Sequence, residues 1–267
     1  MSAVDRAQGP FGPESVAENY RRYLEPVLFA PWADRFVAWA GIEPGDVVLD
    51  LAAGTGAVAR VAAKVAGSTG RVMAQDISTT MLGFAARARE PRTAAITTLA
   101  GPAADLDLPD ASVDVVLCQQ GLPFMADRLA ALRECVRVLR PGGVLAVSVW
   151  VEDEPFEPFD TYARAISGAG REVSNASVTM PLGDVVDVLH ASSLREVAVT
   201  RRTLSVRWPT VESEVAGVFG TPFGAVIDGM EPGVRERVLT SIREQLAGAG
   251  ARTSDRVSTA LFGRGTR

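Results

Sequence analysis

The chain has 267 residues, 47% of them hydrophobic, and it carries a formal net charge of −5 with a pI near 5.1. This length allows one large domain or two small ones around a substantial core. The acidic balance and the lack of a Lys/Arg run argue against a nucleic-acid partner. The sequence has no apolar signal core at its start and no apolar run near the about twenty residues that cross a membrane.

The two cysteines, Cys118 and Cys135, provide neither a disulfide framework nor a metal-ligand spacing. We therefore expect a cytoplasmic protein that works in solution, with no metal and no membrane partner.

The N-terminal part predicts a short mobile segment followed by two helices within residues 14–40. Residues 1–13 are punctuated by Gly and Pro. The first helix starts just after them with Pro in its first turn, and Tyr20 and Leu24 recur in it at helical spacing. The second helix is expected from 32 to 39, ending before a glycine.

From residue 47 onward, strands and helices are predicted to alternate. Apolar runs typical of strands lie near residues 47–51, 71–75, 95–99, 113–118 and 144–150. Segments typical of helices lie near residues 57–66, 78–89 and 127–139. This alternation requires a parallel sheet with helices on both faces, which is an α/β doubly wound fold.

The turn after the first strand indicates a ligand site. The apolar strand contains one acidic residue, Asp50, and small residues up to Gly56 follow before the next helix. Such a turn lets the backbone approach a nucleotide-like ligand, because any side chain would fill the ligand's space. The following strand ends in Asp76, whose carboxylate can accept hydrogen bonds from both ribose hydroxyls. We therefore expect a nucleoside-cofactor site on a βαβ unit.

Two cofactor classes are compatible with this turn. Residues Gly54 to Ala59 match the G-x-G-x-x-A pattern of NAD proteins, so an NAD-dependent oxidoreductase is one interpretation. Asp50 argues against it, because a carboxylate at the mouth of the strand would face an anionic pyrophosphate. A ligand that carries an ammonium and a sulfonium suits this carboxylate better.

Two more motifs follow in order, Leu-Pro-Asp-Ala-Ser-Val-Asp-Val-Val-Leu at 108–117 and Leu-Arg-Pro-Gly-Gly-Val-Leu at 139–145. Together with the glycine turn and Asp76, they resemble the motifs of class I S-adenosylmethionine (SAM) methyltransferases, over about residues 20–150. The chain is most similar to the bacterial small-molecule branch related to ubiquinone and menaquinone biosynthesis methyltransferases. The resemblance implies SAM as cofactor and S-adenosylhomocysteine as product. It also implies a Rossmann-like, mostly parallel seven-stranded sheet whose last two strands form an antiparallel edge hairpin.

The resemblance also implies cofactor-binding residues. Gly54 and Gly56 would line the methionine part and the ribose, and Ile77 and Met81 would sandwich the adenine. Simpler interpretations remain open: Asp76 as a helix cap, and the apolar side chains as helix core. The whole implied set is Tyr20, Asp50, Ala52, Gly54, Gly56, Asp76, Ile77, Met81, Pro102, Ala103, Cys118 and Gln119.

The end of the third strand departs from the family pattern. The family usually has Gly-Asp-Ala there, and this chain has Gly101-Pro102-Ala103. Proline offers no side-chain acceptor to the adenine amino group, and it has no backbone N–H to donate. The Ala103 backbone can still meet adenine, and Asp105 is a second candidate, so adenine recognition is left open.

After residue 150 the pattern changes to loops, short helices and two more strands, near residues 195–206 and 256–262. The connection over 207–254 is much longer than a hairpin needs. We interpret 151–193 and 207–254 as helical cap segments over the cofactor, within a single domain 1–267. Several aromatic side chains of these segments are expected to line an apolar acceptor pocket: Phe156, Phe159, Tyr162, Trp208, Phe219 and Phe223.

No catalytic residue is assigned. Gln119 and Gln120 follow the fourth strand, where the methyl group is expected, and one of them should face the cofactor. Tyr20 and Tyr23 could close over the cofactor or simply pack. The only histidine, His190, lies on a short helix without an identifiable carboxylate partner, so we interpret it as a surface residue and not as a general base.

The leading hypothesis is a SAM-dependent methyltransferase for an apolar small-molecule acceptor, such as a quinone-like compound, a polyketide or another secondary metabolite. The lack of a clear base favours an acidic O- or C-acceptor. The alternative is a SAM-binding cyclase of the same fold that does not transfer the methyl group, and an NAD oxidoreductase is a third interpretation. A homodimer is compatible with the sequence.

Overall fold

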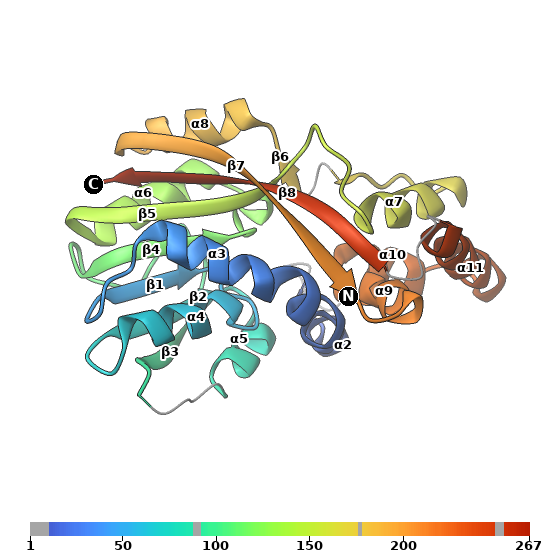
Figure 1. Ribbon diagram of the computed structural model, residues 1–267, viewed down its shortest axis with the longest axis horizontal. Coiled ribbons are helices and arrows are strands. Elements are labelled where there is room, and N and C mark those ends of the chain that lie inside the picture. Colours follow the sequence, from blue (N-terminus) through green and yellow to red (C-terminus); the bar gives the residue numbers. More distant parts are fainter. Residues whose placement is uncertain (1–10, 88–91, 176–177, 249–253) are drawn as a thin grey trace.

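A computed structural model describes residues 11–87, 92–175, 178–248 and 254–267, and places them around one sheet (Figure 1). The strand order is β3-β2-β1-β4-β5-β8-β7, with β6 paired to β5 off this path. The pairs among β1 to β6 are parallel, and β8 is antiparallel to both β5 and β7. The predicted doubly wound sheet with an antiparallel edge hairpin is confirmed.

The strands are β1 (Val47–Leu51), β2 (Arg71–Asp76), β3 (Ala95–Ala100), β4 (Val113–Gln119), β5 (Leu139–Val151), β6 (Thr179–Met180), β7 (Arg195–Trp208) and β8 (Ser254–Thr266). The first helices are α2 (Glu14–Asn19), the π-helix η1 (Tyr20–Phe29), α3 (Ala30–Ala40), α4 (Ala57–Ala66), α5 (Thr79–Ala85), the 3₁₀ turn η2 (Leu122–Phe124) and α6 (Arg128–Val138). The later ones are α7 (Phe159–Gly168), α8 (Leu182–Ala191), α9 (Val211–Gly217), the 3₁₀ turn η4 (Val218–Gly220), α10 (Pro222–Asp228) and α11 (Pro232–Gly248).

The helix expected at 57–66 has these bounds in the structure, while α5 is shorter than expected and ends at Ala85. Among the elements that were not expected are the π-helix η1, the short strand β6, the turn η2, and α10, which begins at a proline. The start of α10 does carry a sequence signal, because proline is favoured in the first turn of a helix.

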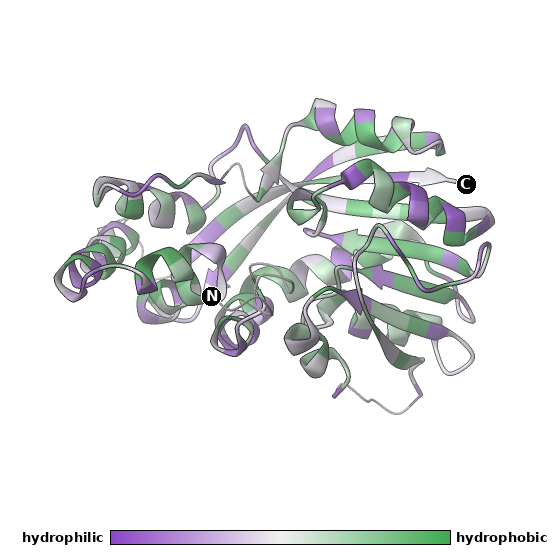
Figure 2. Ribbon diagram, turned by 180° about the vertical axis from the view of Figure 1, so that it is seen from behind, coloured by the Kyte–Doolittle hydropathy of each residue, from purple (hydrophilic) through white to green (hydrophobic). Residues whose placement is uncertain are grey.

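Alternate strand residues build two cores, one on each face of the sheet. In β1, Val48 belongs to the core under α3 and α4, whereas Leu49 and Leu51 belong to the core under α6 and α8. The central strands are buried on both faces, as expected for parallel strands covered by helices. Figure 2 shows the corresponding pattern, with hydrophobic strands inside and hydrophilic residues on the outer helix surfaces.

The edge hairpin reaches beyond the parallel sheet. β7 and β8 pair from Arg195 opposite Thr266 to Trp208 opposite Ser254. Their far ends lie beside α9, α10 and α11 (Figure 1), and α7 packs on α11. The helix α8 packs instead on β7, β8 and α6. Of the two helices in the segment 151–193, α7 therefore packs with α10 and α11, whereas α8 covers the sheet.

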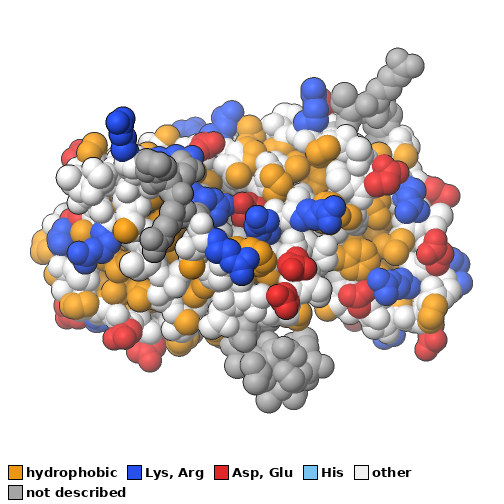
Figure 3. Space-filling view, turned by 90° about the horizontal axis from the view of Figure 1, so that it is seen from below, with side chains coloured by type: hydrophobic (Ala, Val, Ile, Leu, Met, Phe, Trp, Pro, Cys, Tyr) orange, Lys and Arg blue, Asp and Glu red, His pale blue; other side chains and the backbone are white. Residues whose placement is uncertain are grey.

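Most of the N-terminal segment expected to be mobile, residues 1–10, lies outside the described residues. Phe11 packs edge-on against Tyr20 and Phe124, with ring centroids 5.9 and 5.3 Å away. Over the described parts of the chain, no helix is long and apolar enough to cross a membrane. On the face shown in Figure 3, acidic and basic side chains are interspersed.

Candidate cofactor and acceptor site

A cavity of about 410 Å³ lies at the carboxyl ends of β1, β2 and β4. Such an edge is where open α/β sheets bind ligands. Nine of the twelve predicted cofactor residues line it: Tyr20, Ala52, Gly54, Asp76, Ile77, Met81, Pro102, Ala103 and Gln119. The other three, Asp50, Gly56 and Cys118, do not.

Gly54 provides an open place in the turn after β1. Its backbone has φ +54°, and no other atom lies within 4 Å of the position that a Cβ would occupy. Because Gly54 also lines the cavity, a side chain there would project into ligand space. Ala52, with φ 55°, shares the left-handed conformation and brings the turn backbone to the cavity wall.

Asp76 joins the ends of β1 and β2. Its Oδ2 accepts the Gly54 N–H at 2.8 Å and its Oδ1 accepts the Ser78 N–H at 2.8 Å. Burial raises the pKa of Asp76 above its ordinary value, although the N–H donors act in the opposite direction. The cap of α5 is Ser78, whose hydroxyl accepts the Met81 N–H, so Asp76 is not the helix cap.

Gln75 is a site residue that the sequence analysis did not single out. It is buried, its Oε1 accepts the Ala52 N–H at 3.3 Å, and its Nε2 donates to the carbonyl of Gly101. One amide thus connects the turns after β1 and β3. A polar residue one position before the acidic end of an apolar strand was the only available signal.

Apolar side chains form the wall beside Asp76. Ile77 is 45% exposed although it is apolar, and Met81 faces the cavity from α5. Pro102 and Ala103 line the cavity from the end of β3, whereas Asp105 is exposed and is not among the described lining residues. A flat ring of a bound ligand could cover the exposed apolar side chain of Ile77 at this cavity.

Asp50, Gly56 and Cys118 support the turn from behind. Asp50 shares its side of β1 with Val48, and its Oδ2 accepts the Ala59 N–H of α4 at 2.8 Å. Burial raises the pKa of Asp50 to about 8. A Cβ on Gly56 would lie 2.7 Å from the Cβ of Ala85, so this glycine lets α4 pass close to α5.

The Cys118 thiol is fully buried, and burial raises its pKa to about 12. It lies near Gly121, where a Cβ would come within 3.1 Å of the Cys118 sulfur and 2.5 Å of the Ala52 Cβ. These short distances show that the turn after β4 packs closely against the turn after β1.

Gln119, the last residue of β4, and Gln120, which follows it, both line the cavity. Gln119 donates from Nε2 to the carbonyl of Phe29 at 3.1 Å, and Gln120 donates from Nε2 to the Ser148 hydroxyl at 3.1 Å. Their Oε1 atoms are buried and have no hydrogen-bond partner. Gln120 also has φ 59°, a conformation that costs energy in a residue other than glycine and concentrates at functional sites.

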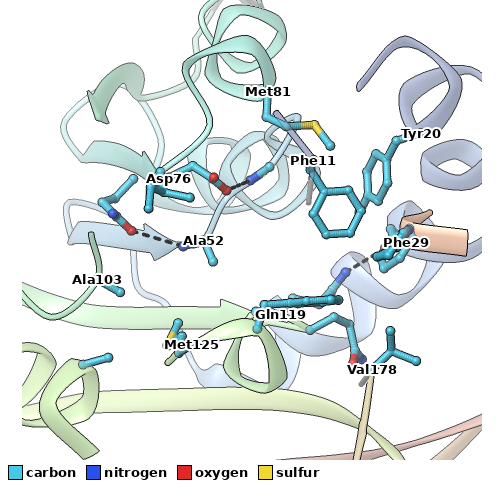
Figure 4. Close-up of a pocket in the computed structure, with 18 of the residues that line it drawn as sticks. Phe11, Tyr20, Phe29, Ala52, Asp76, Met81, Ala103, Gln119, Met125 and Val178 are labelled. Carbon is cyan, nitrogen blue, oxygen red and sulfur yellow. Dashed lines mark hydrogen bonds between the residues drawn. The ribbon is translucent and has the colours of Figure 1, made fainter. Parts of the chain in front are cut away.

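The other end of the cavity is apolar and aromatic. In Figure 4, Phe29 and Val178 lie across the cavity from Asp76 and Ala103, with Phe11 and Tyr20 beside Met81. These residues come from segments far apart in the sequence, and most were not predicted: Phe11, Leu24, Phe29, Phe124, Trp150, Val178, Gly220, Thr221 and Pro222.

Several of six aromatic residues were expected to line an acceptor pocket, and of these six Phe159 alone is among the described lining residues. Phe156, Tyr162, Trp208 and Phe223 are buried in the core, and Phe219 lies half-buried under the Arg235 guanidinium. The six aromatic residues are therefore frequent in these segments mainly because they pack in the core, and one of them, Phe159, also lines the cavity.

Asp76 and Asp127 are the charged residues among the described cavity lining, which contains no Lys, Arg or His. Asp127 is exposed and caps α6 by accepting the Ala130 N–H. His190 is exposed on α8 and lies outside the cavity lining. Among the described residues, no group of three or more His, Cys, Asp or Glu side chains could hold a metal ion.

The sheet order and the turn at its carboxyl edge define a class I methyltransferase fold. The profile of a family described as "Methyltransferase domain" matches residues 49–147. The ubiquinone/menaquinone biosynthesis C-methyltransferase UbiE of Chromobacterium violaceum is 35% identical over 168 residues, covering 60% of this chain and 68% of the relative. The chain belongs to the class I SAM-dependent methyltransferases.

Within that family, the chain is distantly related to the quinone methyltransferases. The chloroplastic 2-phytyl-1,4-beta-naphthoquinone methyltransferase of Arabidopsis thaliana is 37% identical over 120 residues, covering 43% of this chain and 46% of the relative. The chain thus spans about half to two thirds of the length of the curated relatives it matches.

A solved structure shares the fold over most of both chains. It is a methyltransferase assigned to an antibiotic biosynthesis pathway of Anabaena variabilis, with a TM-score of 0.64, 17% identity, and 87% of this chain and 96% of that chain covered.

Proposed function

We propose that the protein transfers the methyl group of SAM to an uncharged, apolar small molecule. The observation that carries this proposal is that one cavity joins the glycine turn and Asp76 at one end to an aromatic wall at the other. The quinones named for the related methyltransferases are acceptors of this kind. A polyketide or another apolar metabolite also belongs to this class.

The residues at the cofactor end suit SAM. Gly54 leaves room for a ligand against the backbone, Asp76 has a carboxylate that can accept from ribose hydroxyls, and Ile77 presents an exposed apolar surface to a base. We assign Tyr20, Ala52, Met81, Pro102, Ala103 and Gln119 to the same cofactor site. Asp50, Gly56 and Cys118 are assigned to holding the turn in place from behind.

The charge of the lining supports an uncharged acceptor. The described lining contains two carboxylates and no cationic side chain, so a phosphate or carboxylate on the acceptor would find no positively charged partner there. An unpaired charge in an apolar cavity is costly. Phe29, Trp150 and Phe159 offer ring faces and edges to an apolar body instead.

SAM supplies an already activated methyl group on a sulfonium. The residues of this chain therefore mainly align the acceptor and exclude water, and such alignment is worth up to about 7–11 kcal/mol in well-oriented systems. We assign α7, η4 and α10 to covering the acceptor end, because Phe159, Gly220 and Pro222 line the cavity. An acidic hydroxyl or carbon acceptor that is neutral in solution can give its proton to water as it binds, because the positive sulfonium of the cofactor would favour the ionised acceptor, and no protein base is then required.

The direct test is turnover with SAM that carries an isotopically labelled methyl group. Apolar phenols and hydroquinones serve as acceptors, each paired with the same ring bearing a carboxylate, and mass spectrometry detects S-adenosylhomocysteine and labelled product. We expect labelled product from the neutral member of a pair. Equal turnover of the carboxylated member would contradict an uncharged acceptor, and a chain that does not bind SAM would overturn the proposal.

The second candidate is a cyclase that binds SAM without using its methyl group. The observation that favours it is the described lining, which has no histidine and no carboxylate besides Asp76 and the capping residue Asp127. A cyclase would give a product with the mass of its substrate and no S-adenosylhomocysteine. The same mass spectra therefore separate the two functions.

A further inference from the structure

The π-helix η1 lies between the cofactor turn and the acceptor wall. It runs from Tyr20 to Phe29, and Tyr20, Leu24 and Phe29 line the cavity. Its wide hydrogen-bond spacing is visible at its end, where the Ala30 N–H donates to the carbonyl of Glu25, five residues earlier. One helix therefore contributes to both ends of the cavity.

The π spacing brings these side chains onto one face. Because each turn of a π-helix takes between four and five residues, Tyr20, Leu24 and Phe29 lie along one face, and Glu25 lies beside it. In an α-helix, the nine residues from Tyr20 to Phe29 would make about two and a half turns and put the rings on opposite sides. In the structure, these two rings stack with centroids 4.7 Å apart and planes 30° apart.

The sequence provides a local reason for the wide turn. Pro26 lies inside η1 and has no N–H to donate. In an α-helix its ring would also collide with the carbonyl of Arg22, and a wider turn relieves this collision. Proline allows the π spacing, but it does not fix the side of η1 that faces the cavity.

Glu25 fixes that side by bonding to the cofactor turn. One carboxylate oxygen accepts from the Arg60 guanidinium at 2.5 Å, and the other accepts from the Thr55 hydroxyl. Arg60 also donates to the carbonyl of Thr55 at 2.8 Å. Thr55 stands between Gly54 and Gly56 and is 1% exposed, so Glu25 holds the turn that the cofactor would contact.

The far end of η1 is tied to the second part of the site. The Gln119 amide donates to the carbonyl of Phe29 from the end of β4 (Figure 4). Phe29 lies 6.2 Å from Trp150 between ring centroids, so the position of Phe29 sets the acceptor wall. A movement of the cofactor turn would reach this wall through Glu25 and η1.

We propose that Glu25 is a positioning residue that couples occupancy of the cofactor turn to the Tyr20–Phe29 wall of the acceptor pocket. The coupling rests on the proposed function, because it needs SAM or its product in the turn. A ligand that orders the turn also orders the hydroxyl and guanidinium that donate to Glu25. The π-helix then holds its face toward the cavity, and the acceptor pocket is complete only when the cofactor is bound.

Amide hydrogen exchange of the full chain, with and without S-adenosylhomocysteine, tests this coupling. In the wild type, the ligand should slow exchange in both the turn, residues 52–60, and the far end of the helix, residues 27–30, which lies away from the Tyr20 end that the cofactor would contact directly. We expect the helix effect to be about 5–150-fold, the usual range of coupling between two sites. In Glu25→Ala the ligand should still protect the turn but no longer the far end of the helix. A merely structural loss would speed exchange equally with and without ligand.

Two further variants make the test decisive. Glu18→Ala removes an exposed carboxylate from the adjoining helix α2 and should keep the wild-type coupling. Glu25→Gln keeps the shape and one acceptor, should retain part of the coupling, and serves if Glu25→Ala does not fold. Ligand-dependent protection of the far end of the helix that persists in both Glu25 variants would overturn the inference, as would its absence in the wild type. A wild type with no protection of the turn would instead overturn the proposed function.

Discussion

The two ends of the cavity are built in different ways. The cofactor end consists of short turns directly after β1, β2 and β3, joined by Asp76 and Gln75. The acceptor end collects side chains from η1, β5, α7 and the η4–α10 corner, which are far apart in the sequence. The first end depends on local backbone geometry and the second on tertiary packing, so substitutions should separate them.

Gly54→Val should break the cofactor end most completely. The new side chain would fill the place where no atom lies within 4 Å, and S-adenosylhomocysteine binding should fall below detection by calorimetry. Its backbone has φ +54°, so some strain of about 1–2 kcal/mol is expected as well. Gly41→Val is the matched control, with φ +81° and free space but outside the cavity lining. Normal binding by Gly54→Val would mean that the turn does not touch the ligand.

Asp76→Ala should weaken S-adenosylhomocysteine binding by about 1.5–3 kcal/mol, the size of hydrogen bonds to a charged group. Asp127→Ala removes a carboxylate from the same cavity rim and should lose only a helix cap, about 1 kcal/mol of stability. Calorimetry of both variants compares the two carboxylates. Wild-type affinity in Asp76→Ala would exclude the ribose assignment.

The same carboxylate should make binding depend on pH. Burial raises the pKa of Asp76 in the structure, while donors from a ribose favour its ionised form and lower that pKa. Affinity for S-adenosylhomocysteine should therefore fall as the pH drops through the raised pKa of Asp76. Asp76→Asn cannot titrate, so its affinity should lose this pH dependence, and an unchanged pH profile would assign the dependence to another group.

Gly220→Ala should disturb the acceptor end. A Cβ at Gly220 would lie 2.6 Å from the backbone N and 2.7 Å from the Cα of Tyr20, so η4 and η1 must move apart. We expect a loss of about 1–3 kcal/mol in the free energy of unfolding, typical of overpacking. Gly229→Ala, whose nearest neighbour is 3.6 Å away, should be near neutral. Denaturant unfolding of the two variants tests this difference, and equal stabilities would show that η1 and η4 are not closely packed.

His190→Ala should affect neither the cofactor end nor the acceptor end of the cavity. His190 is exposed on α8, on the sheet and outside the cavity lining. A positioned general base usually contributes about 10²–10⁴-fold, and we expect less than a tenfold loss in kcat. A larger loss with unchanged SAM affinity would identify His190 as a group that acts on the acceptor.

The sequence was most informative where structure depends on neighbouring residues. The turn at Gly54, the carboxylate of Asp76 and the helix at 57–66 follow from local patterns, and the structure places them as expected. Asp50 was interpreted as facing the ligand because it ends a strand. In the structure it bonds to Ala59 in α4, since alternate strand residues point to opposite faces.

The residues that line the acceptor end could not be predicted from local sequence patterns in the same way. Phe29 faces the cavity only because η1 is a π-helix, and helical periodicity of 3.6 residues would put it on the other side from Tyr20. Phe156 and Tyr162 are near Phe159 in the sequence, yet they are core residues. Which aromatic side chain reaches a cavity is decided by contacts between distant segments, and these leave no periodic signal.

The length of the β7–β8 ladder has a mechanical consequence. A ribbon paired without interruption from Ala198 and Arg264 to Trp208 and Ser254 resists bending, because bending would break its hydrogen bonds. The helices α9 to α11 are therefore connected to the sheet by a rigid two-stranded ribbon that has no hinge. We therefore expect an acceptor to enter and a product to leave without a movement of these helices, and Phe124, which lines the cavity and is 37% exposed, marks a place where the cavity meets solvent.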